Sequence, residues 1–382
     1  MHFKKIIIQL SLSLVLGLSS IQCLMAQNIK KPVIIGYVGG YNGNLIETNK
    51  IDTKRLSHIN YAFVDIKDNL AWLHNEKTDT VNFRKLNELK KINPDLKLMI
   101  SVGGWTWSKH FSDATLTDEL TMKFTKSAVD IVEKYNFDGV DIDWEYPGMK
   151  GDDNTFRSED GKNYTNLFRY LREQLDALGK KTKKQYFVTT AIGGSREFLQ
   201  HTEMEVAQKY LDYINVMSYD FDNTYDNLSS HHQNLYAPEN RPYLYSADLT
   251  IQNLKKVGVD LSKVVMGIGF YGKGKVVAST DNNGLYQIPV SPKSGGGYSF
   301  IKDSLVNKNG YVRYWDEESK APYLFNKKEK HFITYDDEES VKLKCDYIQE
   351  HGLAGAMFWT YFSDPKLYLI SVLNKEFSYN QQ

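Results

Sequence analysis

Short runs rich in Val, Ile, Phe and Tyr recur along the chain, and most of them are bounded by Gly, Asn, Asp or Pro. Between several of the runs, apolar residues return at the spacing of an amphipathic helix. The runs predict strands at 33–39, 58–65, 97–103, 139–144, 186–192, 213–219, 264–270 and 354–359. The helical spacing predicts helices at 81–92, 116–135, 164–178 and 340–351.

Strands that alternate with helices are typical of an α/β protein with a parallel sheet. The number of strands favours a closed (β/α)8 TIM barrel, and an open doubly wound sheet is the alternative that the pattern alone leaves open. The interval 273–334 breaks the alternation, because it is rich in Gly, Tyr and short apolar clusters. We expect a small, mainly β insertion there, between strands 7 and 8, with 27–272 and 335–382 forming the barrel.

The first residues have the pattern of a secretion signal. Lys4 and Lys5 precede an apolar stretch that ends at small residues near Ala26. This order predicts a signal peptide over 1–26 and a secreted or periplasmic protein without stable membrane insertion. A membrane anchor is the alternative, and lipid attachment at Cys23 is another. Cleavage leaves Cys345 alone, so no disulfide within the mature chain is expected.

The charge balance limits the classes of partner. Lys plus Arg and Asp plus Glu each number 47, so the chain offers no net charge with which to attract nucleic acid or an anionic membrane. Aromatic residues make up 13% of the chain, which suits stacking on sugars, although a large core also collects such residues. We expect a monomer that binds no nucleic acid.

The strand expected at 139–144 is unusually acidic. Asp141, Asp143 and Glu145 are spaced by two residues, which places all three on one face of a strand, about 7 Å apart. On the inner face of a barrel, three carboxylates this close cannot all ionise freely, so at least one pKa must rise. A carboxyl group that keeps its proton near neutral pH is suited to general acid catalysis.

A calcium site and a solvated edge strand are the two alternatives for these acids. Calcium sites usually place their ligands in a turn with Asn and Gly, and not along a strand. An edge strand would not normally carry a residue such as Trp144 among so many buried strands. Catalysis is therefore the favoured interpretation, and no metal ion is expected.

The acidic run belongs to a longer pattern that resembles the family 18 glycoside hydrolases, the chitinase group. Residues 138–148 read Asp-Gly-Val-Asp-Ile-Asp-Trp-Glu-Tyr-Pro-Gly, which is similar to the signature of that family. The similarity continues in family order with Ser-Val-Gly-Gly-Trp at 101–105, Met-Ser-Tyr-Asp at 217–220, Gly-Ile-Gly-Phe-Tyr-Gly at 267–272 and Gly-Ala-Met-Phe-Trp at 355–359. The resemblance covers nearly all of the mature chain, and it implies a catalytic barrel at 27–272 and 335–382 with a small α+β insertion at 273–334.

The resemblance implies a retaining mechanism in which the acetamido group of the substrate is the nucleophile. Glu145 would be the general acid and base, and Asp143 would orient the acetamido group while sharing a proton with Asp141. Tyr219 would donate a hydrogen bond to the acetamido oxygen. The resemblance also implies that no cofactor is needed. The residues that it implies contact the sugar are Asp220, Trp359, Tyr146, Met217 and Trp105.

The expected substrate is chitin or chitooligosaccharides, in which N-acetylglucosamine units are joined by β-1,4 bonds. Two other functions remain open. An endo-β-N-acetylglucosaminidase acting on N-glycans would share the acidic strand, and a non-catalytic chitin-binding lectin would share the groove. Retention of Glu145, Asp143 and Tyr219 argues against the lectin.

Overall fold

The computed structural model describes residues 31–221, 227–242 and 244–378. The chain divides into two compact units, Met1–Pro32 and Val33–Gln382, and the fold described below is that of the second. The predicted signal peptide and Cys23 lie outside the described residues. Cys345 is described, and it is a buried free thiol.

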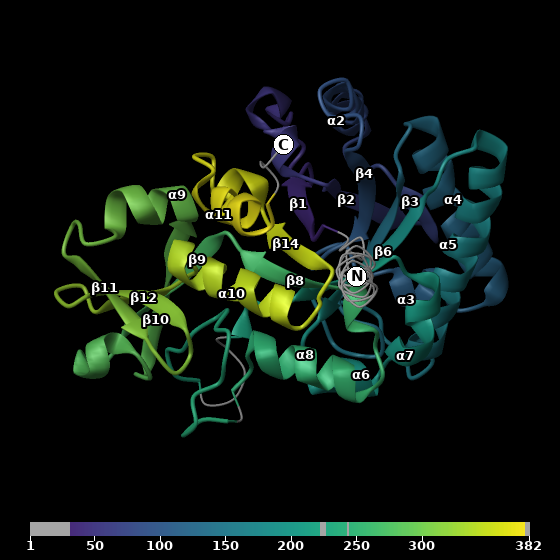
Figure 1. The fold of residues 1–382 in the computed structure, drawn as a ribbon. Coiled ribbons are helices and arrows are strands. Elements are labelled where there is room, and N and C mark those ends of the chain that lie inside the picture. Colours follow the sequence, from purple (N-terminus) through teal and green to yellow (C-terminus); the bar gives the residue numbers. More distant parts are fainter. Residues whose placement is uncertain (1–30, 222–226, 243, 379–382) are drawn as a thin grey trace, which may run out of the picture. The chain divides into compact units, whose positions relative to one another are not determined.

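Eight parallel strands form a closed barrel, which confirms the predicted fold (Figure 1). The strands are β1 (Val33–Gly39), β2 (His58–Lys67), β4 (Lys97–Gly103), β5 (Gly139–Asp143), β6 (Phe187–Gly193), β7 (Tyr213–Met217), β8 (Val264–Gly269) and β14 (Gly355–Trp359). Pairing of β1 with both β2 and β14 closes the ring and excludes the open sheet. A short strand, β3 (Leu70–Trp72), extends β2 as an antiparallel hairpin.

The helices form a layer outside the barrel (Figure 1). The four that the spacing predicted are α2 (Glu76–Leu89), α4 (Asp118–Lys134), α5 (Asp160–Thr182) and α10 (Glu338–Glu350). Six more were not predicted: α3 (Phe111–Ala114), α6 (Arg196–Gln200), α7 (Met204–Ala207), α8 (Ala247–Lys256), α9 (Tyr298–Phe300) and α11 (Tyr368–Glu376). Across the described residues, the helices are too short or too polar to cross a membrane.

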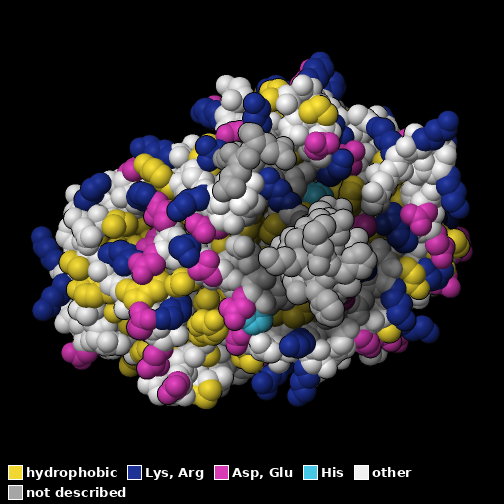
Figure 2. All heavy atoms as spheres, viewed as in Figure 1, with side chains coloured by type: hydrophobic (Ala, Val, Ile, Leu, Met, Phe, Trp, Pro, Cys, Tyr) yellow, Lys and Arg dark blue, Asp and Glu magenta, His cyan; other side chains and the backbone are white. Residues whose placement is uncertain are grey.

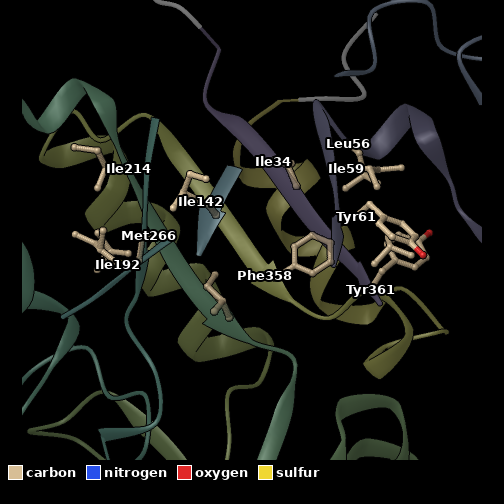
Figure 3. Packing of buried hydrophobic residues seen from close by; sticks show 14 of the residues in the cluster. Ile34, Leu56, Ile59, Tyr61, Ile142, Ile192, Ile214, Met266, Phe358 and Tyr361 are labelled. Carbon is tan, nitrogen blue, oxygen red and sulfur yellow. The ribbon is translucent and has the colours of Figure 1, made fainter. Parts of the chain in front are cut away.

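The main core lies between the outer face of the barrel and these helices. Figure 3 shows Ile142, Ile192, Ile214 and Met266, which come from the neighbouring strands β5 to β8. All four side chains are fully buried, and complete burial of one such side chain stabilises the fold by about 2 kcal/mol. The apolar residues of β5 therefore face the helices, as the alternation predicted, and its acids face the barrel interior.

A second, antiparallel sheet follows β8. It consists of β9 (Tyr271–Val277), β10 (Pro289–Gly297), β11 (Tyr311–Asp316), β12 (Ala321–Asn326) and β13 (His331–Thr334), in the order β10-β9-β13-β12-β11. Figure 1 shows this sheet beside the barrel. It occupies the interval expected to form the insertion, and its first strand begins at Tyr271, with only Phe270 between it and the end of β8.

Charged side chains of both signs are interspersed among the described residues on the face that Figure 2 shows. This arrangement agrees with the equal numbers of basic and acidic residues in the sequence. Many of the charges are paired along single helices, such as Lys123 with Glu119 on α4 and Lys342 with Asp346 on α10. Exposed pairs of this kind contribute little to stability, because water screens the two charges.

Candidate active site

The acidic strand β5 points its carboxylates into the barrel. Asp141 is fully buried, Asp143 is 4% exposed, and Glu145, two residues beyond, is 9% exposed. The alternate residue Trp144 faces outward and stacks on Phe111 with the ring centroids 5.0 Å apart. The strand thus has a charged inner face and an apolar outer face, as the sequence predicted.

The end of β4 fixes the backbone that carries these acids. Gly103 and Gly104 have φ values of +106° and +82°, and a Cβ on Gly103 would lie 2.3 Å from the carbonyl oxygen of Asp143. The amide of Gly104 donates to that carbonyl at 2.7 Å. Glycine is therefore required here, because a side chain would collide with the neighbouring strand.

Ser108 completes this anchor. Its hydroxyl is fully buried and accepts the amide hydrogen of Glu145 at 2.9 Å. The same hydroxyl lies 3.0 Å from the carbonyl oxygen of Asp143 and donates to it. Glu145 is consequently held by a side chain from the loop after β4, which sequence reasoning missed because no motif marked it.

Asp141 sits in a complete set of donors. Its Oδ2 accepts hydrogen bonds from the hydroxyls of Tyr37 at 2.8 Å and Ser101 at 2.7 Å. Its Oδ1 accepts from the hydroxyl of Thr189 at 2.6 Å and the amide of Asn215 at 3.2 Å. Burial raises the pKa of Asp141, and these hydrogen bonds oppose the rise.

Asp143 lies in the opposite kind of environment. Within the described part of the chain, its buried Oδ1 has no hydrogen-bond partner. Burial, then the charge of Glu145, then that of Asp141, raise the pKa of Asp143 well above its ordinary value. A buried acceptor without a partner is costly unless a ligand satisfies it, so this oxygen is available to a substrate donor.

Glu145 has a pKa near neutrality. Burial raises the pKa of its carboxyl to about 7, a hydrogen bond with Tyr146 lowers it, and the charge of Asp220 raises it. Burial and the charge of Glu145 raise the pKa of the Tyr146 hydroxyl well above its usual value. Glu145 is therefore a carboxyl group that holds a proton through the mildly acidic range and can give it up near neutral pH.

Tyr219 and Asp220 follow directly after β7, which ends at Met217, two residues earlier than predicted. The hydroxyl of Tyr219 stays protonated, because burial and the charges of Asp143 and Asp220 raise its pKa well above its usual value. Asp220 has a φ of +63°. Although burial opposes it, contacts with His232, Lys273 and Tyr271 hold the pKa of Asp220 below its ordinary value.

A pocket of about 220 Å³ brings most of the predicted residues together. Its lining includes Glu145, Tyr146, Met217, Tyr219 and Asp220. It also includes residues that the sequence did not single out, from the ends of β6 and β7, α6 and nearby loops: Met149, Gly193, Gly194, Ser195, Phe198, Phe221 and Tyr245. Asp141 and Asp143 are not among the lining residues and lie on the strand that leads to it.

Trp359 and Trp105 lie apart from that lining. Trp359 stacks on Phe63 with ring centroids 5.5 Å apart and on Tyr41 with ring centroids 6.2 Å apart. It is therefore part of an aromatic group formed by the end of β14, by β2 and by the segment after β1. Trp105 is 52% exposed, and its ring lies 6.4 Å from that of Tyr146. The predicted residues thus extend from the barrel interior to an exposed rim.

Several residues that shape the site were missed. The four donors to Asp141 come from four different strands, and the partners of Asp220 come from two segments outside the acidic motif. A period-two pattern in β1 and β7 would have indicated that Tyr37 and Asn215 face inward. In residues 31–221, 227–242 and 244–378, no group of three or more His, Cys, Asp or Glu side chains has an arrangement that could hold a metal ion.

Comparisons with known proteins point to a single family. The profile of the glycosyl hydrolases family 18 matches residues 33–364. Chitinase A1 from Niallia circulans is 36% identical over 94% of this chain, and the chain spans 60% of the length of that relative. Chitinase B from Serratia marcescens is 31% identical over 80% of this chain and 72% of its own length.

A solved structure has the same fold over nearly its whole length. It is described as a glycoside hydrolase family 18 N-acetylglucosaminidase from Paenibacillus barengoltzii, and its sequence is 36% identical to this chain. The alignment has a TM-score of 0.83 and covers 90% of this chain and 99% of that one. The match therefore includes the barrel and the second sheet together.

Proposed function

The chain belongs to the glycosyl hydrolases family 18, and from that premise we propose that it is a chitinase-like hydrolase of β-1,4-linked N-acetylglucosamine. The observation that carries the proposal is the pocket in which Glu145, with a pKa of about 7, lies with Tyr219 and Asp220. The names of its relatives, which include chitinases from several bacteria, support the substrate class.

Glu145 acts first as the acid and then as the base. Its protonated carboxyl gives a proton to the glycosidic oxygen as the bond to the anomeric carbon breaks. The resulting carboxylate later takes a proton from the water that completes hydrolysis. A pKa of about 7 supports this double use, because neither protonation state is strongly disfavoured near neutral pH.

The nucleophile comes from the substrate. The oxygen of the acetamido group closes on the anomeric carbon, which gives an oxazolinium ion and retention of configuration. The Oδ1 of Asp143, which lacks a partner among the described residues, accepts the acetamido N–H. The protonated hydroxyl of Tyr219 donates to the acetamido oxygen and holds it in line.

Asp141 acts behind Asp143. Its four donors favour the ionised form, and its charge raises the pKa of Asp143. Asp141 and Asp143 share one proton. When the oxazolinium ion forms, its positive charge stabilises the carboxylate of Asp143, so the shared proton moves toward Asp141. This sharing is part of the proposal.

The sugar itself contacts aromatic and apolar side chains. Trp359 forms the floor beneath the distorted ring, held in place by Phe63 and Tyr41. Met217 and Tyr146 line the pocket around it, and the exposed ring of Trp105 stacks on a sugar further along the groove. Asp220 contacts the sugar or its acetamido group.

The cellular location at which the protein acts is part of the same proposal. The lysines and apolar residues of 1–26 support cleavage of a signal peptide, with secretion or periplasmic release of a monomer. Polymeric chitin is an extracellular substrate too large to enter a cell. Fractionation of an expressing cell, with the mature N-terminus read by mass spectrometry, tests this point; a retained N-terminus at Met1 contradicts it.

The product profile over time on chitohexaose, together with a high-mannose glycopeptide, tests the substrate. We expect cleavage of chitohexaose and no release of the N-glycan. Cellohexaose is the matched control, because it has the same linkage and lacks the acetamido group. Efficient cleavage of cellohexaose contradicts the substrate-assisted mechanism, and cleavage of the glycopeptide alone favours the endo-β-N-acetylglucosaminidase.

The structural similarity to an N-acetylglucosaminidase favours a second candidate within the same chemistry. An enzyme that removes single N-acetylglucosamine units would use the same acid and the same acetamido nucleophile. The first products from chitohexaose distinguish the two, because monomer and pentamer appear together in that case. Tight binding without any cleavage would instead indicate the lectin.

A further inference from the structure

His232 is a buried histidine that the proposed chemistry does not use. Its side chain has no exposed surface, and its Nδ1 lies 3.5 Å from Oδ1 of Asp220. Its ring centroid is 5.2 Å from that of Tyr271. The same Oδ1 of Asp220 accepts a hydrogen bond from the Tyr271 hydroxyl at 2.7 Å and lies 3.3 Å from Nζ of Lys273.

The backbone of His232 is fastened on two sides. Its amide donates to the hydroxyl of Thr334 on β13 at 3.1 Å. Its carbonyl accepts the amide hydrogen of Phe221, the residue after Asp220, at 3.0 Å. The second sheet thus holds His232, and His232 in turn holds the chain next to Asp220.

The neighbouring residues make this segment rigid. The side chain of Gln233 pairs with both the amide and the carbonyl of Gly269, at 2.7 Å and 3.0 Å, where β8 ends. The carbonyl of Gln233 accepts from Nζ of Lys344 at 2.7 Å, and Lys344 is paired with buried Asp336. The charged or titratable side chains next to the His232 ring include Asp220 and Tyr271. Lys273 lies against the same oxygen of Asp220, and the Lys344–Asp336 pair lies behind Gln233.

We propose that His232 is a positioning residue for Asp220, which links the placement of the second sheet to the orientation and ionisation of that carboxylate. The inference rests on the proposed function, because it takes Asp220 to act in the sugar site. The side chain of Asp220 is 50% exposed, so its carboxylate depends on the contacts with His232, Tyr271 and Lys273 to hold one orientation. Support from His232 favours the ionised form of Asp220 at acidic pH.

The first test is a pH profile of His232→Asn with a soluble N-acetylated chitooligosaccharide. Loss of the contact raises the proton affinity of Asp220 toward that of an ordinary aspartate, so activity falls at acidic pH. We expect the ratio of kcat/KM at pH 4 to that at pH 6 to fall about two- to tenfold relative to wild type. An unchanged ratio in a folded His232→Asn protein overturns the inference.

His231→Asn is the matched control. His231 is the adjacent buried histidine, and its Nε2 lies 3.0 Å from Asp316 on β11, not from Asp220. We expect it to leave the ratio unchanged, with melting temperatures recorded at both pH values. A double-mutant cycle adds a second criterion: in an Asp220→Asn background, His232→Asn should have no further effect on the ratio. Additive effects overturn the inference.

A spectroscopic test needs no His232 variant to fold. In protein labelled at histidine, Asp220→Asn should shift the ring resonances of His232, and Asp316→Asn should shift those of His231 instead. Unmoved His232 resonances in Asp220→Asn overturn the contact. This readout is independent of hydrolysis, so wild-type protein that cleaves no chitooligosaccharide defeats the proposed function and leaves the contact to be judged by the spectra.

Discussion

Asp141 and Asp143 are two residues apart on one strand and face the same barrel interior, yet their surroundings differ. Asp141 accepts four hydrogen bonds from donors on β1, β4, β6 and β7. The Oδ1 of Asp143 has no hydrogen-bond partner among the described residues, and burial, Glu145 and Asp141 raise the pKa of Asp143. The hydrogen-bonding capacity of Asp141 is filled by protein donors, whereas Asp143 keeps an acceptor oxygen for the proposed substrate contact.

This difference shows how a barrel can hold an acidic strand. At the deep end, neutral hydroxyl and amide donors satisfy the carboxylate of Asp141, so no positively charged residue has to be buried beside it. The outer end leaves two carboxyl groups, Asp143 and Glu145, to repel each other, which keeps a proton in the site at mildly acidic pH. One strand therefore carries a hydrogen-bonded carboxylate in the interior and two mutually repelling carboxyl groups at its outer end.

The largest expected effect is at the outer end. Glu145→Gln removes the proton that the leaving oxygen needs, so kcat should fall by about 10²–10⁴-fold while chitooligosaccharide binding is retained. Steady-state kinetics and calorimetric binding check this. Glu76→Gln, at an exposed position in the first turn of α2, is the control for the substitution itself. Turnover near wild type in Glu145→Gln would remove Glu145 from its role.

A crossed pair of variants tests the contrast directly. Asp143→Asn should lower kcat about 10²-fold, because the oxazolinium ion loses the negative charge that stabilises it, with little loss of stability. Asp141→Asn should lower the free energy of unfolding by about 1–3 kcal/mol, because its amide hydrogens would face donors. Denaturant melts and kinetics on both proteins check this. The reverse pattern, with Asp143 as the stability residue, contradicts the assignment.

The pH dependence follows from the raised pKa of Glu145. The group is active as an acid while protonated, and its pKa in the folded protein is about 7. The value of kcat/KM should therefore fall on the alkaline side by about tenfold per pH unit above that point. A profile measured in constant ionic strength checks this. If kcat/KM instead begins to fall at the ordinary pKa of a glutamate, burial does not raise the pKa of Glu145.

The smallest expected effect is that of chelation. If the acids of β5 act as proton carriers and acceptors, removal of divalent cations by dialysis against a chelator should leave kcat unchanged. A parallel sample with added Ca²⁺ is the control. Loss of activity that Ca²⁺ restores would revive the alternative of a calcium site and would change the interpretation of the unpartnered oxygen of Asp143.

Much of the fold could be predicted from the sequence. Each predicted barrel strand agrees with the structure to within two residues at either end, because a buried parallel strand is a short apolar run with clear ends. The inward face of β5 followed from the period of two alone. Helices such as α3, α6 and α7 were missed, since four or five residues are too few to show a helical period.

The candidate site was predicted in its residue types and less well in its arrangement. The motif residues Glu145, Tyr146, Met217, Tyr219 and Asp220 come together in one pocket. Ser108, Tyr37 and His232 were missed because their effect depends on contacts across 37, 104 and 12 residues of chain, respectively. The order of the motifs indicates the family, but it does not specify these contacts.

By itself, the sequence determined the alternation of strands and helices, the place of an insertion after the seventh strand, and a row of acids facing inward. Those properties are set by local periodicity and by the spacing of residues along one strand. Only the tertiary structure decided which acid is satisfied, which has a pKa near 7, and what holds Asp220. The reason is physical: a pKa depends on burial and on donors from other strands, which only folding brings together.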